Sequence, residues 1–371
     1  MFVVSTKKDF IEDALVAKDG IVCFGAGRMV NELEYLLGDQ LKNIIYFVDK
    51  DELKQRDGVV LLGKKIEVLS YEEAEKRLEN KNVVILITRM DFVEILELLT
   101  NNKIFSRAKI HCLYFIRGFI QEEEDLKQSI PENIKIYDKQ VIPKIIHYCW
   151  FGNKEIPQQN IEWIDTWKKY CPDYKIVRWD ESNYDVNKNR YVKEAYEANK
   201  WAFISDYARM DILYNYGGIY LDVDVELISN IDDMLYEDAF ICFETPKRVA
   251  SGLGIGARKN SRIIKRFMDY YEGRSFFMED GKMDLTPCPI HETKILKEIG
   301  LVNNGSYQVL DGITVYPEKM LTGKSASTRR IKFTNYTRAI HHYDASWESD
   351  KKRKNINKID ELITRQLVGM K

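Results

Sequence analysis

The sequence contains few of the features that mark several large classes of protein. Its six cysteines are scattered over 371 residues, and no two of them form a Cys-x-x-Cys pair. This spacing argues against a zinc site, and a chain of this length rarely depends on a disulfide framework. The longest apolar runs, such as residues 83–87, are far too short to span a bilayer.

Neither sign of charge dominates the sequence. It has 56 lysines and arginines against 58 aspartates and glutamates, which gives a net charge of −2. Such a balance creates no general attraction to nucleic acid, so we expect no nucleic-acid partner. Lys7, Lys8 and Asp9 interrupt the start of the chain before an apolar stretch of signal-peptide length can form. We therefore expect a cytoplasmic protein with reduced thiols.

The patterns that are present predict two α/β domains. In the first part, short apolar runs at residues 20–24, 44–48 and 83–88 alternate with helical patterns. This alternation is typical of βαβ units in a parallel sheet, and it predicts a smaller Rossmann-like domain over residues 1–120. A polar, acidic stretch over residues 121–140 lacks periodicity and is interpreted as a linker.

A second α/β domain is predicted over residues 141–347. Apolar runs predict strands at residues 144–150, 174–179 and 219–223, and helical periodicity predicts helices at residues 158–170 and 202–216. Residues 348–371 form a tail that begins with a basic run and continues as an amphipathic helical pattern. A basic amphipathic helix can bind an anionic membrane surface, and packing on its own domain is the alternative.

The first glycine turn matches part of a dinucleotide-binding fingerprint. Gly25 and Gly27 follow a strand and precede a helix, and Asp49 ends the next strand, where a ribose-binding acid would lie. Val30 occupies the place of the third glycine. A nucleotide site at Gly25, Gly27 and Asp49 therefore stays open beside a scaffold role without a ligand.

Two aspartates end the strand predicted over residues 219–223. Asp222 and Asp224 are two positions apart, so both carboxylates project from one side of an extended strand. Hard oxygen ligands in this arrangement suit Mn²⁺ or Mg²⁺, which also bind the oxygens of a substrate diphosphate. An Asp-x-Asp pair alone is common, and many such pairs hold no metal.

The helix predicted over residues 202–216 carries a further pair of polar side chains. Asp206 and Arg209 are three positions apart and share one helix face. A guanidinium suits a phosphate group and a carboxylate suits sugar hydroxyls, whereas an ordinary surface ion pair is the alternative interpretation.

Four blocks in order resemble the glycosyltransferases that carry a Gly-Gly-x-Tyr-x-Asp-x-Asp motif. These include bacterial capsule and lipopolysaccharide sugar transferases, yeast mannosyltransferases of family 32 and, more distantly, the clostridial glucosylating toxins. The central block is GGIYLDVD at residues 217–224, after Asp206 and Arg209. The opening strand PKIIHYCWFG at residues 143–152, the pair Trp179-Asp180 and the closing block AIHHYDASW at residues 339–347 are similar to the other three.

The resemblance implies a GT-A fold with a nucleotide-sugar pocket at the strand ends. It implies Mn²⁺ or Mg²⁺ bound by Asp222, Asp224 and His342, with His341 as the alternative third ligand. The resemblance also implies a set of catalytic and donor-binding residues, for which core aromatic or structural roles are the alternatives. This set comprises Trp150, Asp206, Arg209, Tyr220, Asp222, Asp224, Ser346 and Trp347.

The activity implied is a retaining transfer of a hexose or N-acetylhexosamine from a UDP-sugar. The expected acceptor is a glycan or lipid-linked saccharide in bacterial capsule or surface-polysaccharide synthesis, reached from the cytoplasm at the inner face of the plasma membrane. Two other functions are kept as alternatives. One is an NAD(P)-dependent sugar-nucleotide oxidoreductase acting through the N-terminal domain, and the other is a catalytically silent sugar-nucleotide-binding protein.

Two segments of the predicted second domain are harder to interpret. The glycine-rich stretch at residues 251–256 is no P-loop, because no Gly-Lys-Ser/Thr follows it; it either lets backbone approach the sugar or forms turns. Glu292 begins a helical pattern and is interpreted as an acceptor contact.

Overall fold

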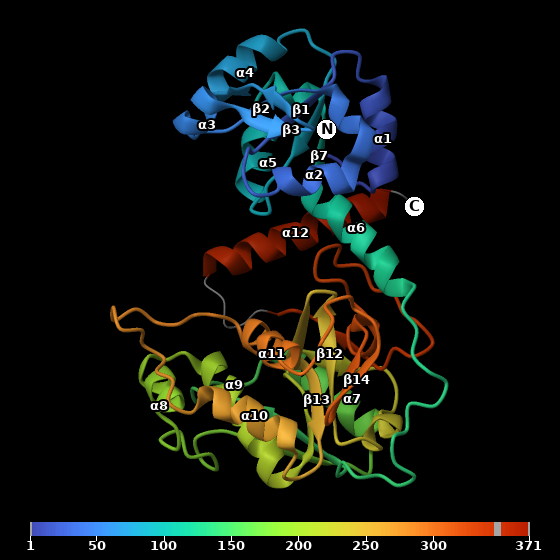
Figure 1. Cartoon of the computed structure of the whole chain (residues 1–371), viewed down its shortest axis with the longest axis vertical. Coiled ribbons are helices and arrows are strands. Elements are labelled where there is room, and N and C mark those ends of the chain that lie inside the picture. Colours follow the sequence, from blue (N-terminus) through green and yellow to red (C-terminus); the bar gives the residue numbers. More distant parts are fainter. Residues whose placement is uncertain (1, 345–349, 370–371) are drawn as a thin grey trace. The chain divides into compact units, whose positions relative to one another are not determined.

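The computed structural model of the chain describes residues 2–344 and 350–369, without the side chains of residues 350–353 and 365–369. The described residues form two compact units, drawn in Figure 1. Unit 1 comprises the residues up to 123, residues 326–329 and the C-terminal helix; unit 2 comprises residues 124–325 and the segment from 330.

Unit 1 is built on a five-stranded parallel sheet with the order β5-β2-β1-β6-β7. The strands are β1 (Ile21–Phe24), β2 (Ile44–Val48), β5 (Val68–Leu69), β6 (Val84–Ile87) and β7 (Lys109–Cys112), with a separate hairpin of β3 (Val59–Leu61) and β4 (Lys64–Ile66). The chain winds outward from β1 in both directions, which places crossover helices on both faces. The parallel sheet predicted for this part of the sequence is confirmed.

Helices cover both faces of this sheet because the strand residues are apolar on both sides. The helices are α1 (Lys7–Val16), α2 (Val30–Leu37), α3 (Glu52–Asp57), α4 (Tyr71–Leu78), α5 (Val93–Asn101), α6 (Leu113–Leu126) and α12 (Asp350–Gly369). On one face Leu33 and Leu36 of α2 are buried. On the other face Leu96 and Leu99 of α5 are buried.

Helix α6 runs through the start of the segment that we interpreted as a linker. It continues to Leu126, so the irregular chain begins several residues later than residue 121. Two of the four adjacent acidic residues in this segment are buried: Glu122 is 3% exposed and accepts a hydrogen bond of 2.8 Å from the Thr328 hydroxyl, and Asp125 is 4% exposed. Glu123 and Glu124 are exposed. A local charge pattern cannot reveal such distant partners.

The C-terminal helix α12 packs on unit 1. Ile363 is buried in the core with Phe92 and Phe115, and Ile359 and Leu362 pack against the same cluster. Three apolar residues of this helical pattern therefore pack against protein, as in the alternative of a helix packed on its own domain. Membrane contact through the helix stays a prediction.

Unit 2 is built on a mixed seven-stranded sheet with the order β14-β15-β12-β13-β10-β8-β9. The strands are β8 (Ile145–Cys149), β9 (Lys175–Trp179), β10 (Gly218–Tyr220), β12 (Ala239–Thr245), β13 (Arg248–Ala257), β14 (Gln308–Leu310) and β15 (Ile313–Tyr316). Strands β9, β8 and β10 are parallel, and β13 pairs antiparallel with β10. The carboxyl ends of β8, β9 and β10 therefore lie at one edge, where sheets of this kind bind ligands.

Two helical layers cover this sheet. The helices are α7 (Gln158–Tyr170), α8 (Arg190–Glu197), α9 (Trp201–Tyr216), α10 (Arg262–Tyr271) and α11 (Cys288–Lys297). Ile204 and Leu213 of α9 pack with α8, α10 and α11 in one core cluster, whereas Ile164 and Trp167 of α7 belong to the other. In Figure 1, α10 and α11 lie in front of β13. Helix α9 is almost wholly buried, which makes its two charged site residues unusual.

The strand predicted over residues 219–223 ends earlier than expected. Strand β10 stops at Tyr220, and residues 221–224 form a turn before strand β11 (Val225–Leu227). The Val225 N–H donates to the Asp222 carbonyl at 3.1 Å, which closes this turn. Strand β11 then pairs antiparallel with β16 (Ala339–His341), and Val225 lies opposite His341. This pairing joins the closing block to the Asp-x-Asp turn.

Among the described residues, no helix has both the length and the apolar character that crossing a membrane requires.

Candidate active site

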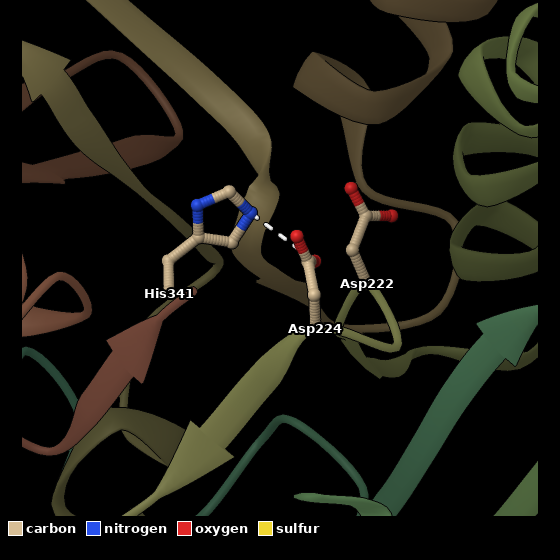
Figure 2. Close-up of side chains that lie close together, drawn as sticks. All are labelled: Asp222, Asp224 and His341. Atoms are coloured by element: carbon tan, nitrogen blue, oxygen red, sulfur yellow. Dashed lines mark ion pairs between the residues drawn. The ribbon is translucent and has the colours of Figure 1, made fainter. Parts of the chain in front are cut away.

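Asp222, Asp224 and His341 converge beside the end of β10 (Figure 2). One potential ligand atom from each side chain lies within 4.8 Å of those of the other two. Asp222 and Asp224 come from the turn after β10, and His341 comes from the end of β16. The arrangement offers two carboxylates and one imidazole to the same point, a donor set that suits Mn²⁺ and also accepts Mg²⁺.

The Asp224 carboxylate is held by the closing block. His341 Nε2 lies 3.2 Å from Asp224 Oδ1, and the Asp344 backbone N–H donates to Oδ2 at 2.9 Å. Burial alone would raise the pKa of Asp224, but the attraction of His341 and these hydrogen bonds lower it to about 2. The same attraction raises the pKa of His341 against the effect of its burial. The pair therefore favours a carboxylate and a charged imidazole when no cation lies between them.

The Asp222 carboxylate is positioned by two residues that sequence analysis had connected with the donor. The Tyr220 hydroxyl donates to Asp222 Oδ1 at 2.8 Å, and Arg209 Nη2 lies 3.6 Å from the same oxygen. Tyr220 is 1% exposed, and its ring lies under the Arg209 guanidinium at 4.8 Å. Tyr220 thus acts through Asp222 and Arg209, because its ring is covered and has no face left for a nucleotide.

Asp206 and Arg209 form a buried ion pair on α9. Their exposed fractions are 7% and 4%, and Arg209 Nη2 lies 3.2 Å from Asp206 Oδ1. Burial raises the pKa of Asp206 to about 6, although Arg209 opposes this rise. The surface ion pair considered as an alternative is therefore wrong for these two residues. Buried charges at the edge of a donor site can hold a polar ligand once water is displaced.

A second layer behind Arg209 was not predicted from the sequence. Arg209 Nη1 donates to the Ser251 hydroxyl at 2.8 Å, and Ser251 in turn donates to Glu292 through its hydroxyl and, at 3.0 Å, its backbone N–H. Glu292 is 2% exposed. The interpretation of Glu292 as an acceptor contact is therefore wrong, because its carboxylate faces into unit 2. The Cys288 Sγ also lies 3.6 Å from Arg209 Nη1.

His342 points away from the two aspartates, whereas the alternative ligand His341 lies beside them. The His342 ring stacks on Trp163 at 4.1 Å, and its Nε2 lies 2.8 Å from Glu226 Oε2. Successive side chains along an extended segment alternate in direction, so only one of the two histidines can face the turn. We therefore replace His342 by His341 as the candidate third ligand.

The predicted aromatic contact Trp150 lies directly after β8. Its side chain is partly exposed, and its indole Nε1 donates to the Lys154 carbonyl at 2.7 Å. Part of the Trp150 ring is accessible at this strand end. Stacking of a nucleotide base on the ring stays a prediction. Ser346 and Trp347 lie outside the described residues.

The glycines of residues 251–256 make room for neighbouring side chains. They lie within β13, so the alternative of turns is wrong for this segment. A Cβ on Gly252 would lie 2.3 Å from Asp222 Oδ2, and a Cβ on Gly256 would lie 2.2 Å from the Phe240 ring. Gly252 therefore leaves the space that the Asp222 carboxylate occupies.

The acid of the candidate nucleotide site in unit 1 accepts several hydrogen bonds from within the protein. Asp49 is 8% exposed and accepts hydrogen bonds from the Ala26 N–H at 2.8 Å, the Asp51 N–H at 3.1 Å and Lys54 Nζ at 3.0 Å. Gly25 has a φ of +112°, and a Cβ there would meet the Arg89 side chain at 2.5 Å. Asp49 thus binds the glycine turn itself, and Gly25 is explained by backbone geometry. Gly27 has open space around it.

Comparison with known proteins identifies the class of the second unit. Residues 157–241 match the family model described as a glycosyltransferase sugar-binding region containing the DXD motif. The matched segment contains Asp206, Arg209, Asp222 and Asp224. Two of the three converging residues, Asp222 and Asp224, therefore belong to a DXD region, and His341 lies outside the matched segment. Glycosyltransferases with this region generally use a divalent metal ion.

Similar proteins occur in two yeasts and in a bacterium, and one of the three described below is named a mannosyltransferase. Inositol phosphoceramide mannosyltransferase 3 of Schizosaccharomyces pombe is 35% identical over 36% of this chain and 40% of its own length. Mannosyl phosphorylinositol ceramide synthase SUR1 of Saccharomyces cerevisiae is 32% identical over 35% of this chain and 33% of its own. Subversion of eukaryotic traffic protein A of Legionella pneumophila is 25% identical over 52% and 35%, respectively.

A solved structure titled PaToxG Glycosyltransferase aligns with 49% of this chain and 79% of that chain, at 22% identity and a TM-score of 0.35. The chain spans less than half the length of the three relatives described above. The likeness to these relatives is thus confined to part of each protein.

Proposed function

We propose that the chain is a metal-dependent glycosyltransferase of the GT-A type that transfers a hexose or N-acetylhexosamine from a nucleotide diphosphate sugar. The observation that carries this proposal is the convergence of Asp222, Asp224 and His341 within 4.8 Å, with Arg209 beside Asp222. A cation at this point would neutralise charge on the departing nucleotide diphosphate. Manganese or magnesium is the ion that the donor set favours.

The chain's own residues supply the rest of the proposed chemistry. Asp222, Asp224 and His341 hold the cation, and the buried guanidinium of Arg209 stabilises negative charge that develops on the diphosphate. Asp206 accepts hydrogen bonds from hydroxyl groups of the donor sugar. Because these groups are fixed before the donor binds, most of the rate enhancement is electrostatic and positional. We propose retention of the anomeric configuration, as the family resemblance implies.

The donor is proposed to be a UDP-sugar, as we inferred from the sequence. The fungal relatives are named mannosyltransferases, so GDP-mannose is the principal competing donor. Trp150 can stack on either base, and the choice between them depends on groups at the base edge.

The acceptor is proposed to be a glycan or sugar carried by a lipid. The names of two fungal relatives contain a ceramide lipid, which supports a lipid acceptor for this chain as well. A role in surface-polysaccharide assembly on the cytoplasmic side of a membrane is the setting that we propose.

An oxidoreductase activity through unit 1 has less support. The Asp49 carboxylate, which would bind the ribose of NAD, already accepts hydrogen bonds from Ala26, Asp51 and Lys54. The glycosyltransferase match, in contrast, contains Asp222 and Asp224 of the ligand cluster in unit 2.

Nucleotide release from a panel of donors tests the proposal. UDP-galactose, UDP-glucose, UDP-N-acetylhexosamines and GDP-mannose are each incubated with the wild type in Mn²⁺ or in EDTA, with and without a lipid-linked acceptor. We expect one donor to be consumed only with metal, and Asp224→Asn to abolish its consumption. Asp165→Asn is the matched control, because Asp165 is an exposed residue of α7. Absence of both binding and turnover with every donor would contradict the proposal.

A further inference from the structure

Three carboxylates surround one guanidinium in the candidate site. Arg209 lies beside Asp206 and Asp222 directly, and it reaches Glu292 through the Ser251 hydroxyl. Glu292 is the fifth residue of α11, and Ser251 comes from β13. Hydrogen bonds through β13 and α11 therefore hold the Arg209 guanidinium that would face the donor diphosphate.

The Ser251 hydroxyl links these two groups in a defined direction. A hydroxyl has one hydrogen to donate, and here Arg209 Nη1 donates to its oxygen at 2.8 Å. The hydroxyl hydrogen must therefore point to Glu292, which also accepts the Ser251 backbone N–H at 3.0 Å. Ser251 is 0% exposed and Glu292 is 2% exposed, so water cannot replace either partner.

We propose that Glu292 is a positioning residue that orients Arg209 toward the donor diphosphate through Ser251. This inference rests on the proposed function, because it assigns Arg209 to the phosphate groups. Glu292 itself touches neither the donor nor the metal. Its ionised carboxylate keeps the Ser251 hydroxyl turned toward it, which leaves an oxygen lone pair for Arg209. A protonated Glu292 can donate to that oxygen instead and releases the Ser251 hydrogen toward Arg209, which breaks the link.

The orientation therefore depends on pH. Burial raises the pKa of Glu292 to about 7, and Arg209 together with the two hydrogen bonds from Ser251 opposes this rise. The titratable groups that face Glu292 are Arg209 and Asp206 of α9, Cys288 of its own helix and Tyr271 of α10. Asp206 is the competing source of a pH effect, because its pKa is raised to about 6. If ionisation of Glu292 controls the activity, kcat should rise with pH around a midpoint of about 7. If ionisation of Asp206 controls it, the midpoint should lie at about pH 6.

The test compares kcat, donor KM and their pH profiles for the wild type, Glu292→Gln, Glu292→Asp and Ser251→Ala. We expect Glu292→Gln and Ser251→Ala to lower kcat by about 10- to 100-fold, as loss of a supporting contact typically does. Donor KM should change by less than threefold. The acid limb of kcat should move from pH 7 toward pH 6 in Glu292→Gln, and Glu292→Asp should recover part of the lost kcat.

Several controls separate positioning from loss of structure. Glu298→Gln alters an exposed carboxylate next to α11 and should keep the wild-type kcat and pH profile. A merely structural role of Glu292 would lower the active fraction and the unfolding temperature without moving the acid limb, and that result would overturn the proposal. A wild-type pH profile and kcat in Glu292→Gln would also overturn it while the proposed function stood. A wild type that neither binds nor consumes any donor would instead refute the proposed function and, with it, this inference.

Discussion

The third candidate ligand is one of two adjacent histidines, and only the structure distinguishes between them. Sequence analysis favoured His342, and the structure places His341 beside Asp224. Two adjacent histidines carry the same chemistry, so composition cannot choose between them; the pairing of β11 with β16 does. Asp222, Asp224, Asp206 and Arg209, in contrast, could be predicted because their spacing matches a known motif.

Replacing each histidine by alanine tests this choice. We expect His341→Ala to weaken Mn²⁺ affinity at least about tenfold, because a candidate ligand is removed, and His342→Ala to change it by less than about threefold. Electron paramagnetic resonance of free Mn²⁺ measures both affinities directly. The reverse ranking would return the third ligand to His342. Equal, small effects would exclude both histidines from the metal site.

A buried carboxyl away from the site gives unit 2 a pH-dependent stability. Glu237 is 1% exposed and accepts a hydrogen bond of 2.7 Å from the Tyr316 hydroxyl, and burial raises its pKa to about 8. The unfolded chain ionises this group near its ordinary pKa of 4.5. The stabilisation that protonated Glu237 contributes is therefore fully present below pH 4.5. As pH rises toward 8 this contribution is lost, and the free energy of unfolding falls by about 1.4 kcal/mol per pH unit.

Glu237→Gln should remove this slope, because the amide keeps an acceptor for Tyr316 and cannot ionise. We expect the variant to be more stable than the wild type by a few kcal/mol (about 5 at most) at pH 9 and similar to it at pH 5. All six tryptophans lie between residues 150 and 347, so their fluorescence during urea unfolding reports on unit 2. Parallel pH profiles of the two proteins would contradict the assignment.

Among the elements, the hairpin before α11 presents exposed apolar side chains. Phe276 anchors it at 0% exposure, whereas Met278 and Leu285 are 46% and 51% exposed. The Met278 N–H donates to the Lys282 carbonyl at 2.8 Å, which closes the hairpin. Its chain continues into Cys288, which contacts Arg209. A lipid-linked acceptor could bury its apolar part on this hairpin.

Met278→Ser and Leu285→Ser test this use of the hairpin. Each should raise the KM for a lipid-linked acceptor by about tenfold, because each buried apolar side chain contributes about 1.5–3 kcal/mol. The KM for the donor should stay the same. Val309→Ser is the control, since Val309 is an equally exposed residue of β14. An unchanged acceptor KM in both hairpin variants would exclude the hairpin as the acceptor surface.

Helix α12 stabilises unit 1 through Ile363, which is 4% exposed. We expect Ile363→Ala to cost about 2–4 kcal/mol of unfolding free energy, measured by hydrogen exchange of the strand β1 and β6 amides. Thr364→Ala, an exposed neighbour, should cost far less. Loss of liposome binding in Ile363→Ala, with unchanged amide protection, would instead restore the membrane role expected from the sequence.

Elements were predicted well where local pattern determines them. The predicted helix at residues 158–170 coincides with α7, and α9 begins one residue before its predicted start. The strand that should have carried Asp222 and Asp224 was predicted too long, because a turn closed by the Asp222 carbonyl interrupts it. The amphipathic pattern of α12 was correct, but a pattern of this kind does not distinguish a membrane from a protein core as its partner.

Over the whole molecule, the sequence pattern predicts two α/β domains, and the motif predicts that the chemistry lies in the second. It could not anticipate the contacts that link distant segments: Asp224 with His341, or Arg209 with Ser251 and Glu292. Such contacts depend on strand order and helix packing, which a single sequence does not reveal. The Gly25 and Gly27 turn shows the opposite case, since a local motif matched while its acid Asp49 took another role.

Binding of UDP, measured by calorimetry in Mn²⁺ and in EDTA, tests the central claim most directly. If Asp222, Asp224 and His341 hold a cation for the donor diphosphate, the wild type should bind UDP at least about 100-fold more tightly in Mn²⁺ than in EDTA. Asp224→Asn should lose that difference. Asp165→Asn should keep it. Equal UDP affinity with and without metal in the wild type, or an undiminished metal effect in Asp224→Asn, would contradict the account.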